Sequence, residues 1–157
     1  MHDDRIDYQA LAEFRYQIRR FIRFSEQAAR SAGIEPQQHQ LLLAIKGLPA
    51  SLRPTIRTLA DRMQLHHHSA VELIDRLEKA GMVNRSRSDV DRREVLIGLS
   101  QKGERLLRGL SLYHHDELRD SGPALAQTLR RLIARTPTAV SAEKVLSASR
   151  RSTAKRK

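Results

Sequence analysis

The pattern of apolar and polar positions changes its period twice between residues 55 and 99. From Thr55 to Met63, and again from His67 to Ala80, apolar residues recur every three or four positions, which predicts two short helices. The apolar side of the second helix comprises Ala70, Leu73, Ile74 and Leu77. Two β-like runs follow at 82–87 and 94–99, and a charged stretch separates them. Helix, turn, helix and charged hairpin is the order of a winged helix-turn-helix.

Residues at the ends of these segments support the same boundaries. Thr55 can cap the first helix, and Gln64-Leu65 turns the chain before the second. Gly81 stands where a glycine commonly ends a helix. His66 stands at the cap of the second helix, and histidine is a weaker cap than serine or aspartate.

Longer helical patterns flank this segment. Residues 7–32 carry a long apolar stripe, a second helix begins at Pro36, and a third begins after Ser100. Asp120-Ser121-Gly122-Pro123 is expected to break that third helix, and residues 124–135 are expected to form the last one. The chain is therefore predicted to be mainly α with one small β-hairpin.

The charge balance narrows the class of partner. The 157 residues carry a formal net charge of +11, no cysteine and few aromatic residues. A basic excess of this size attracts polyanions, with nucleic acid first and anionic membranes second. No apolar run reaches the ~20 residues that span a bilayer, and the acidic start has no signal segment. A cytoplasmic protein with no membrane partner, no disulfide and no thiol redox switch is expected.

Three stretches together resemble the multiple antibiotic resistance regulator (MarR) family, namely LADRM, SAVELIDRLEKAGMVNR and DVDRREVLIGLSQKGERLL. They share with it the DRLE-x-x-G-x-V helix end, the Asp91-x-Arg93 hairpin and the Leu99-Ser100-x-x-Gly103 entry to the next helix. The resemblance implies a homodimeric bacterial transcription repressor or activator that binds double-stranded DNA on the nucleoid. In the family a short strand precedes the first short helix, and Leu52 or Thr55-Ile56 would supply it.

The resemblance also implies a domain organisation. One domain would cover residues 1–140, with a winged helix-turn-helix lobe at about 36–99 and dimerisation helices at about 7–32 and 101–135. Residues 141–157 are small, polar and then basic, a composition that predicts a disordered tail. Such a tail would add sequence-independent affinity for phosphate.

A helix in the major groove presents donors and acceptors to base edges and cations to phosphates. The resemblance assigns these contacts to His67, His68, Ser69, Glu72, Arg76 and Lys79. Glu72 departs from the family, where a basic or neutral residue is usual, because a carboxylate repels phosphate. It would either accept from the N4 amino group of cytosine or pair with Arg76 one turn on. Alternatively, all six are polar surface side chains that contact only solvent.

The charged stretch between the β-like runs is expected to form the exposed tip of the hairpin. A cation there can enter a narrow A·T-rich minor groove, whose negative potential is enhanced. In the family's Asp-x-Arg pattern the aspartate carboxylate holds the arginine in place. The resemblance therefore assigns Arg93 to the minor groove and Asp91 to bracing Arg93. Arg92 is assigned to a nearby phosphate. A solvated charged turn is the alternative.

The family also binds effectors between its dimerisation helices and its winged lobe, often small aromatic or phenolic acids. Guesses for the walls of such a pocket are Phe14, Ile18, His39, Leu42 and Tyr113. Alternatively, His39 is an ordinary surface or partly buried side chain and contacts no ligand.

Other functional classes have weaker support. The run His66-His67-His68 and the pair His114-His115 suggest a metal-responsive regulator, but neighbouring helical residues point about 100° apart and chelate poorly. No nucleophile elbow, glycine-rich phosphate loop or carboxylate pair predicts an enzyme, and no cofactor is expected. The main rival is a winged-helix module for protein contacts, with only nonspecific affinity for nucleic acid.

Overall fold

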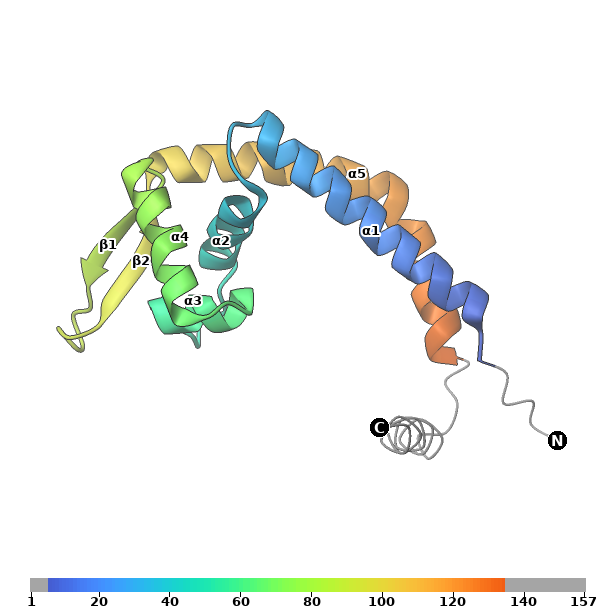
Figure 1. Cartoon of the computed structure of the whole chain (residues 1–157), viewed down its shortest axis with the longest axis horizontal. Helices are drawn as coiled ribbons and strands as arrows, with labels where there is room; N and C mark the ends of the chain where they lie inside the picture. Colours follow the sequence, from blue (N-terminus) through green and yellow to red (C-terminus); the bar gives the residue numbers. More distant parts are fainter. Residues whose placement is uncertain (1–5, 135–157) are drawn as a thin grey trace, which may run out of the picture. The chain divides into compact units, whose positions relative to one another are not determined.

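The computed structural model describes residues 6–134. In chain order the elements are α1 (Tyr8–Ser31), α2 (Pro36–Lys46), α3 (Ile56–Met63), α4 (His67–Lys79), β1 (Val83–Arg87), β2 (Val95–Leu99) and α5 (Gln101–Ala134) (Figure 1). This confirms the prediction of a mainly helical chain with one hairpin. The basic tail at 141–157 lies outside the described residues.

The described chain divides into two compact units. The larger one covers residues 21–119 and contains the winged helix-turn-helix; the smaller one joins residues 6–20 to 120–134. Both α1 and α5 contribute to both units, because each helix continues across the boundary.

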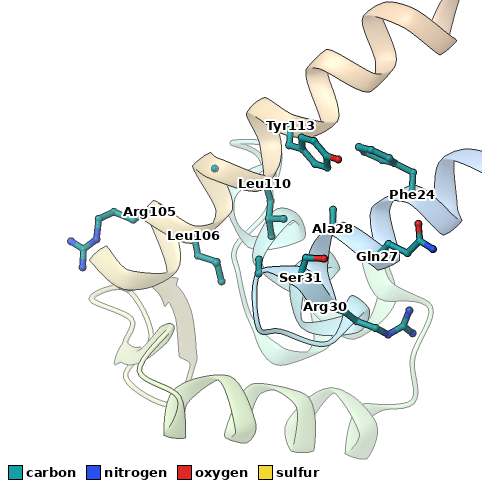
Figure 2. A pocket seen from close by; sticks show the side chains of 11 residues that line it. Phe24, Gln27, Ala28, Arg30, Ser31, Arg105, Leu106, Leu110 and Tyr113 are labelled. Carbon is teal, nitrogen blue, oxygen red and sulfur yellow. The ribbon is translucent and has the colours of Figure 1, made fainter.

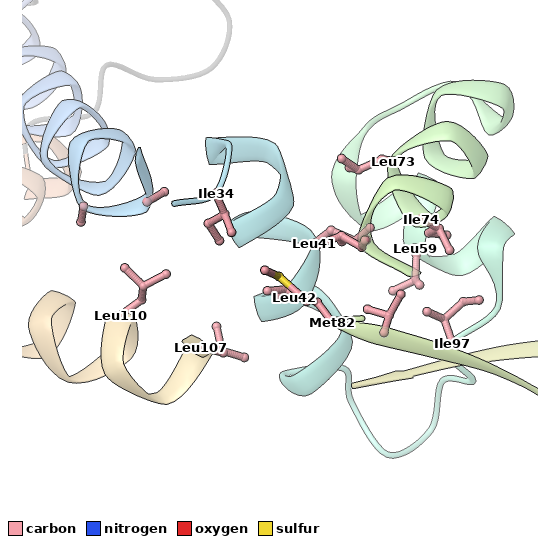
Figure 3. Close-up of a cluster of buried hydrophobic side chains, with 14 residues drawn as sticks. Ile34, Leu41, Leu42, Leu59, Leu73, Ile74, Met82, Ile97, Leu107 and Leu110 are labelled. Atoms are coloured by element: carbon pink, nitrogen blue, oxygen red, sulfur yellow. The ribbon is translucent and has the colours of Figure 1, made fainter. Parts of the chain in front are cut away.

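The core of the larger unit collects the apolar sides that periodicity predicted. Ala70, Leu73, Ile74 and Leu77 of α4 are all buried, as are Leu59 and Ala60 of α3. Every helix and both strands contribute side chains to this core, and Figure 3 shows several of them meeting there. The fully buried side chains include Leu41, Leu42, Leu59, Ile74, Leu77, Val83 and Ile97. Burial of these side chains fixes α4 by one side and leaves its other side toward solvent.

The helix ends follow the predicted capping chemistry. The Thr55 hydroxyl accepts from the Thr58 N–H at 3.1 Å and so caps α3. Gln64 adopts a left-handed backbone (φ 53°) at the turn between α3 and α4. Gly81 has φ 71°, a conformation that only glycine adopts at little cost, so the chain reverses directly into β1.

The hairpin is a two-stranded antiparallel sheet in which Val83 pairs with Leu99 and Arg87 pairs with Val95. A third short segment lies beside β2, because Thr55 forms a bridge with Leu96 and the Pro54 carbonyl accepts from the Ile97 N–H at 2.8 Å. Of the two segments expected to add a strand here, the one containing Thr55 does so.

The expected break in the last helix is wrong. Helix α5 continues from Gln101 to Ala134 with Pro123 inside it. A proline removes one backbone hydrogen bond and costs roughly 3 kcal/mol in a helix. Partly buried residues beyond it, among them Leu125 and Ala126, lose their packing if the helix stops, which outweighs that cost. The breaker residues lie instead beside the boundary between the two compact units at Arg119 and Asp120.

The smaller unit is tied near its chain ends by one aspartate. The Asp7 carboxylate caps α1 by accepting from the Ala10 N–H at 2.9 Å. It also accepts from the Arg131 guanidinium of α5, at 2.7 Å from Nε and 3.2 Å from Nη2. The two helices of this unit are therefore joined by a bidentate pair.

Candidate DNA-binding interface

The outer side of α4 carries the side chains that were predicted to contact DNA. His67, His68, Glu72, Arg76 and Lys79 are exposed, and Ser69 is half-buried. These positions are exposed because the other side of the helix is inserted into the core. The helix therefore presents hydrogen-bonding groups near its start and cations toward its end, which is the distribution that base edges and phosphates require.

The start of α4 has no side-chain cap. His66 occupies the N-cap position without a capping hydrogen bond, as its weak capping ability predicted. Its ring stacks instead on that of His68, with centroids 5.8 Å apart and planes 6° apart. The first turn of α4 therefore has no capping side chain at His66, and the two stacked imidazoles are exposed there.

The acidic residues of α4 divide into a paired set and a free one. Asp75 and Glu78 both bind the guanidinium of Arg85 on β1. The hydrogen bond that Arg85 donates to the Asp75 carboxylate, together with the negative charges of Asp75 and Glu78, raises the pKa of Arg85. Between 6 and 134, Glu72 has no ion pair, and the predicted link to Arg76 is not formed. Arg85 thus neutralises two carboxylates that would repel phosphate, while Glu72 is available as an acceptor.

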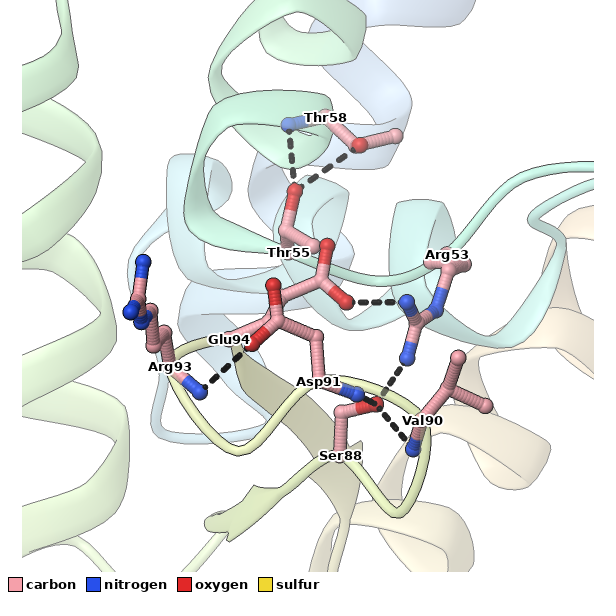
Figure 4. A network of polar contacts seen from close by, with 8 residues as sticks. All are labelled: Arg53, Thr55, Thr58, Ser88, Val90, Asp91, Arg93 and Glu94. Atoms are coloured by element: carbon pink, nitrogen blue, oxygen red, sulfur yellow. Dashed lines mark hydrogen bonds and ion pairs between the residues drawn. The ribbon is translucent and has the colours of Figure 1, made fainter.

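Asp91, Arg92 and Arg93 are exposed at the hairpin tip, and Figure 4 shows the contacts of Asp91 and Arg93 there. The carboxylate of Asp91 accepts from the backbone N–H of Arg93 at 2.9 Å, and not from its guanidinium. This differs from the predicted carboxylate–guanidinium brace, because an aspartate readily bonds to the backbone two residues on in a tight turn. The Arg87 guanidinium also donates to the Arg92 carbonyl at 3.2 Å. Asp91 therefore shapes the backbone of the tip and leaves the Arg93 side chain exposed.

Sequence reasoning missed the residues that hold the root of the tip. Arg53, from the loop before α3, pairs with Glu94 and donates to the hydroxyl of Ser88. Ser88 is 35 positions from Arg53 along the chain, so no local pattern signals the contact. The only sequence signal was Pro54, which favours an extended conformation for the residue before it.

Among the cavities beside α5 in the larger unit, two are lined by residues guessed for a ligand site. One of about 870 Å³ is lined by α1 and α5, with Phe24 and Tyr113 stacked at 4.8 Å and Arg30 and Arg105 at its edges (Figure 2). The other measures about 350 Å³ and is lined by α1, α2 and α5. Its walls are Phe21, Ile22, Ser25, His39, Gln40, Leu43, Ser111, His114, His115 and Leu118.

The five residues guessed for an effector pocket do not share one cavity. His39 lines the smaller cavity and Tyr113 the larger one. Leu42 is fully buried in the core and has no surface to offer a ligand. Phe14 and Ile18 belong to the smaller compact unit. The family resemblance suggested these five residues, and helical periodicity does not distinguish a core position from a cavity wall.

A pair of histidines forms the polar part of the smaller cavity. His39 is 4% exposed, and its ring lies 4.9 Å from that of His114. His114 is held by two hydrogen bonds, from Nδ1 to the Leu110 carbonyl at 2.6 Å and between Nε2 and the Ser25 hydroxyl at 2.8 Å. Burial, and secondarily the charge of His114, lower the pKa of His39. The structure thus favours a neutral imidazole at position 39.

The lowered pKa of His39 predicts a pH dependence of stability. Below the unfolded pKa of about 6.5, the unfolded chain binds this proton more readily than the folded one, so the free energy of unfolding should fall as pH drops. Chemical denaturation at pH 7.5 and 5.5 measures the decrease. His39→Gln should reduce it, whereas His115→Gln, which removes an exposed histidine from the same cavity, should not. Equal decreases in wild type and His39→Gln would contradict this assignment.

The described residues also bear on metal binding and on membrane insertion. In the part of the chain that the structure describes, no three His, Cys, Asp or Glu side chains are grouped to hold a metal ion. Among the same residues, no helix has the length and apolar character needed to cross a membrane.

Comparison with known proteins gives a consistent family. Residues 32–94 match the model of the MarR family. The curated regulator YfiV of Bacillus subtilis (strain 168), an uncharacterized HTH-type transcriptional regulator, is 36% identical over 66 residues. This match covers 42% of the present chain and only 41% of the relative.

Solved structures share the fold over most of the chain. MepR, a transcription regulator of the Staphylococcus aureus multidrug efflux pump MepA, superposes with a TM-score of 0.67 at 16% identity, covering 82% of this chain and 98% of MepR. The S. aureus MepR–DNA complex gives a TM-score of 0.56 at 20% identity, covering 77% and 96% of the two chains. Residues 32–94 thus match the MarR family, and the fold of the described chain is similar to that of solved transcription regulators such as MepR.

Proposed function

We propose that this chain is a homodimeric, sequence-specific DNA-binding transcription regulator. One observation carries the proposal: α4 exposes His67, His68, Arg76 and Lys79 on the compact unit whose hairpin exposes Arg92 and Arg93. A helix with donors and acceptors near its start suits the major groove, and a cationic hairpin tip suits the adjacent backbone or minor groove. A structural relative of the same fold has been solved bound to DNA.

The base contacts would come from the first two turns of α4. His67, His68 and Ser69 can donate to or accept from base edges, and Glu72, free of any ion pair with Arg76, can accept from the N4 amino group of cytosine. Arg76 and Lys79 would contact phosphates. This division assigns specificity to the start of the helix and affinity to its end.

The dimer is proposed from exposed apolar side chains on the long helices. Leu11, Tyr16 and Ile22 of α1 are 41–52% exposed in the single chain, and Leu129 of α5 is 42% exposed. A second copy that covers them would remove this apolar surface from water. Two lobes related by a two-fold axis would bind half-sites one helical turn, or roughly 34 Å, apart.

Selection from a random duplex library tests the function directly. The purified full chain should enrich a near-palindromic sequence, and its affinity for that duplex should fall steeply with salt because several phosphates are contacted. If no sequence is enriched and all duplexes bind alike, the chain is a winged-helix interaction module with only nonspecific affinity. Light scattering of the same sample at micromolar concentration should give the mass of a dimer.

The cavity of about 350 Å³ is the proposed site of effector control. Its walls are mainly apolar, and Ser25, His39 and His114 supply polar groups at one end. Such a site suits a small aromatic or phenolic acid, whose ring would pack on Phe21 and Leu118 while its oxygens bond to polar groups of the wall such as the His39 imidazole and the Ser25 hydroxyl. Coupling requires that the ligand bind two states of the dimer differently. Titration of benzoic and hydroxybenzoic acids against the protein–duplex complex would show this as release of the duplex.

A further inference from the structure

Arg53 reaches both ends of the hairpin tip (Figure 4). Its guanidinium pairs with the carboxylate of Glu94, where the tip returns toward β2. The same guanidinium donates to the hydroxyl of Ser88, where the tip leaves β1. One cation from outside the hairpin therefore joins the two positions that bound residues 89–93.

The two residues that follow Arg53 are held in place by contacts with other elements. The neighbouring Pro54 carbonyl accepts from Ile97 of β2 at 2.8 Å, and Thr55 both bridges to Leu96 and caps α3. The loop that carries Arg53 is thus anchored to the sheet and to the first helix of the helix-turn-helix. Because this loop is anchored, the Arg53 side chain couples the position of the hairpin tip to that of the helices.

Ser88 is the centre of the contacts on the other side. It is 2% exposed, and its hydroxyl accepts from the N–H groups of Val90 at 3.1 Å and Asp91 at 3.2 Å. The Asp91 carbonyl in turn accepts from the Glu94 N–H at 2.9 Å. These bonds close the tip around the Ser88 hydroxyl, and the Arg53 guanidinium binds the same hydroxyl, so the amide bonds of the tip depend on where Arg53 holds it.

We propose that Arg53 and Glu94 are positioning residues that hold the hairpin tip in the orientation needed for DNA recognition. This inference rests on the proposed function, since it assigns a role in operator binding to two residues that need not touch a base. Their pair is partly exposed, with side chains 42% and 29% accessible. Its contribution is therefore expected in the geometry of the tip more than in global stability.

The sign of one substitution separates positioning from simple charge. Glu94→Gln removes a negative charge beside the cationic tip, so electrostatic attraction to DNA alone predicts tighter binding. Loss of the Arg53 partner predicts the reverse, a decrease in operator affinity of about threefold to tenfold. The matched control is Asp89→Asn on the same hairpin, because Asp89 is exposed and, among the described residues, forms no ion pair. It should bind as tightly as wild type or more tightly.

Two readouts test the proposal on the full chain. Hydrogen exchange of the Val90 and Asp91 amides in the free protein should become faster in Glu94→Gln and in Arg53→Gln, with the amides of α4 unchanged. Fluorescence anisotropy with the selected duplex at fixed salt should show weaker binding for Glu94→Gln, and the exchanged pair Arg53→Glu with Glu94→Arg should recover affinity beyond the sum of the single effects.

The outcomes are distinguishable from those of the proposed function. If the wild type selects no duplex, DNA recognition is wrong, and the exchange rates still decide whether Arg53 holds the tip. If the wild type binds its operator and Glu94→Gln binds as tightly as Asp89→Asn, the positioning role is wrong. Unchanged amide exchange at Val90 and Asp91 in both single variants would overturn it equally.

Discussion

Replacing Gly103 with alanine should lower the free energy of unfolding by about 2–4 kcal/mol. A Cβ atom at this position of α5 would lie 2.2 Å from the Met82 carbonyl oxygen and 3.1 Å from its carbonyl carbon. Both are backbone atoms, and the same carbonyl already accepts from the Ser100 N–H at 3.0 Å, so the neighbour cannot move aside without breaking that hydrogen bond. The start of α5 would have to separate from the start of β1.

Gly109 offers the matched control in the same helix. A Cβ there meets no atom within 4 Å, and alanine is more favourable than glycine in a helix by up to about 1 kcal/mol. Urea denaturation followed by circular dichroism should therefore show Gly103→Ala destabilised and Gly109→Ala equal to wild type or more stable. A Gly103→Ala protein within about 0.5 kcal/mol of wild type would mean that α5 begins less closely against β1 than the structure shows.

Arg93→Ala should weaken operator binding by on the order of 1–3 kcal/mol and flatten the preference at flanking A·T positions. The Arg93 side chain is exposed at the hairpin tip while its backbone is fixed by Asp91, so the guanidinium is free to enter a narrow minor groove. Arg92→Ala is the comparison, because removing a cation that binds only phosphate should weaken all sequences about equally and reduce the salt dependence. Gel-shift titration of the selected duplex and of flank-substituted duplexes measures both.

Asp91→Ala tests the same prediction with the opposite charge. It removes a negative charge from the tip, yet it should weaken operator binding because the Arg93 N–H loses its acceptor and the turn loosens. Tighter binding of the operator by Asp91→Ala at fixed salt would show that the carboxylate acts only through its charge. Preserved A·T preference in Arg93→Ala would exclude this arginine from the minor groove.

The sequence alone predicted the helices that precede the hairpin, the hairpin itself and the sides that α3 and α4 bury. Ala70, Leu73, Ile74 and Leu77 recur at helical spacing, and all four are in the core. Thr55 and Gly81 act at the predicted helix ends, because capping and positive-φ turns depend on side chains a few residues apart. Each of these features is local, so a short window of sequence contains its cause.

The tertiary structure decided what depends on contacts between distant residues. It carried α5 through Pro123, since packing on both sides of the proline outweighs one missing hydrogen bond. It also brought Arg53 to Ser88 and Glu94, and Ser25 of α1 to His114 of α5, 89 positions apart. Periodicity shows which side of an element is apolar but not which partner covers it. The Arg53 contacts and the histidine pair therefore form only when the elements are packed together.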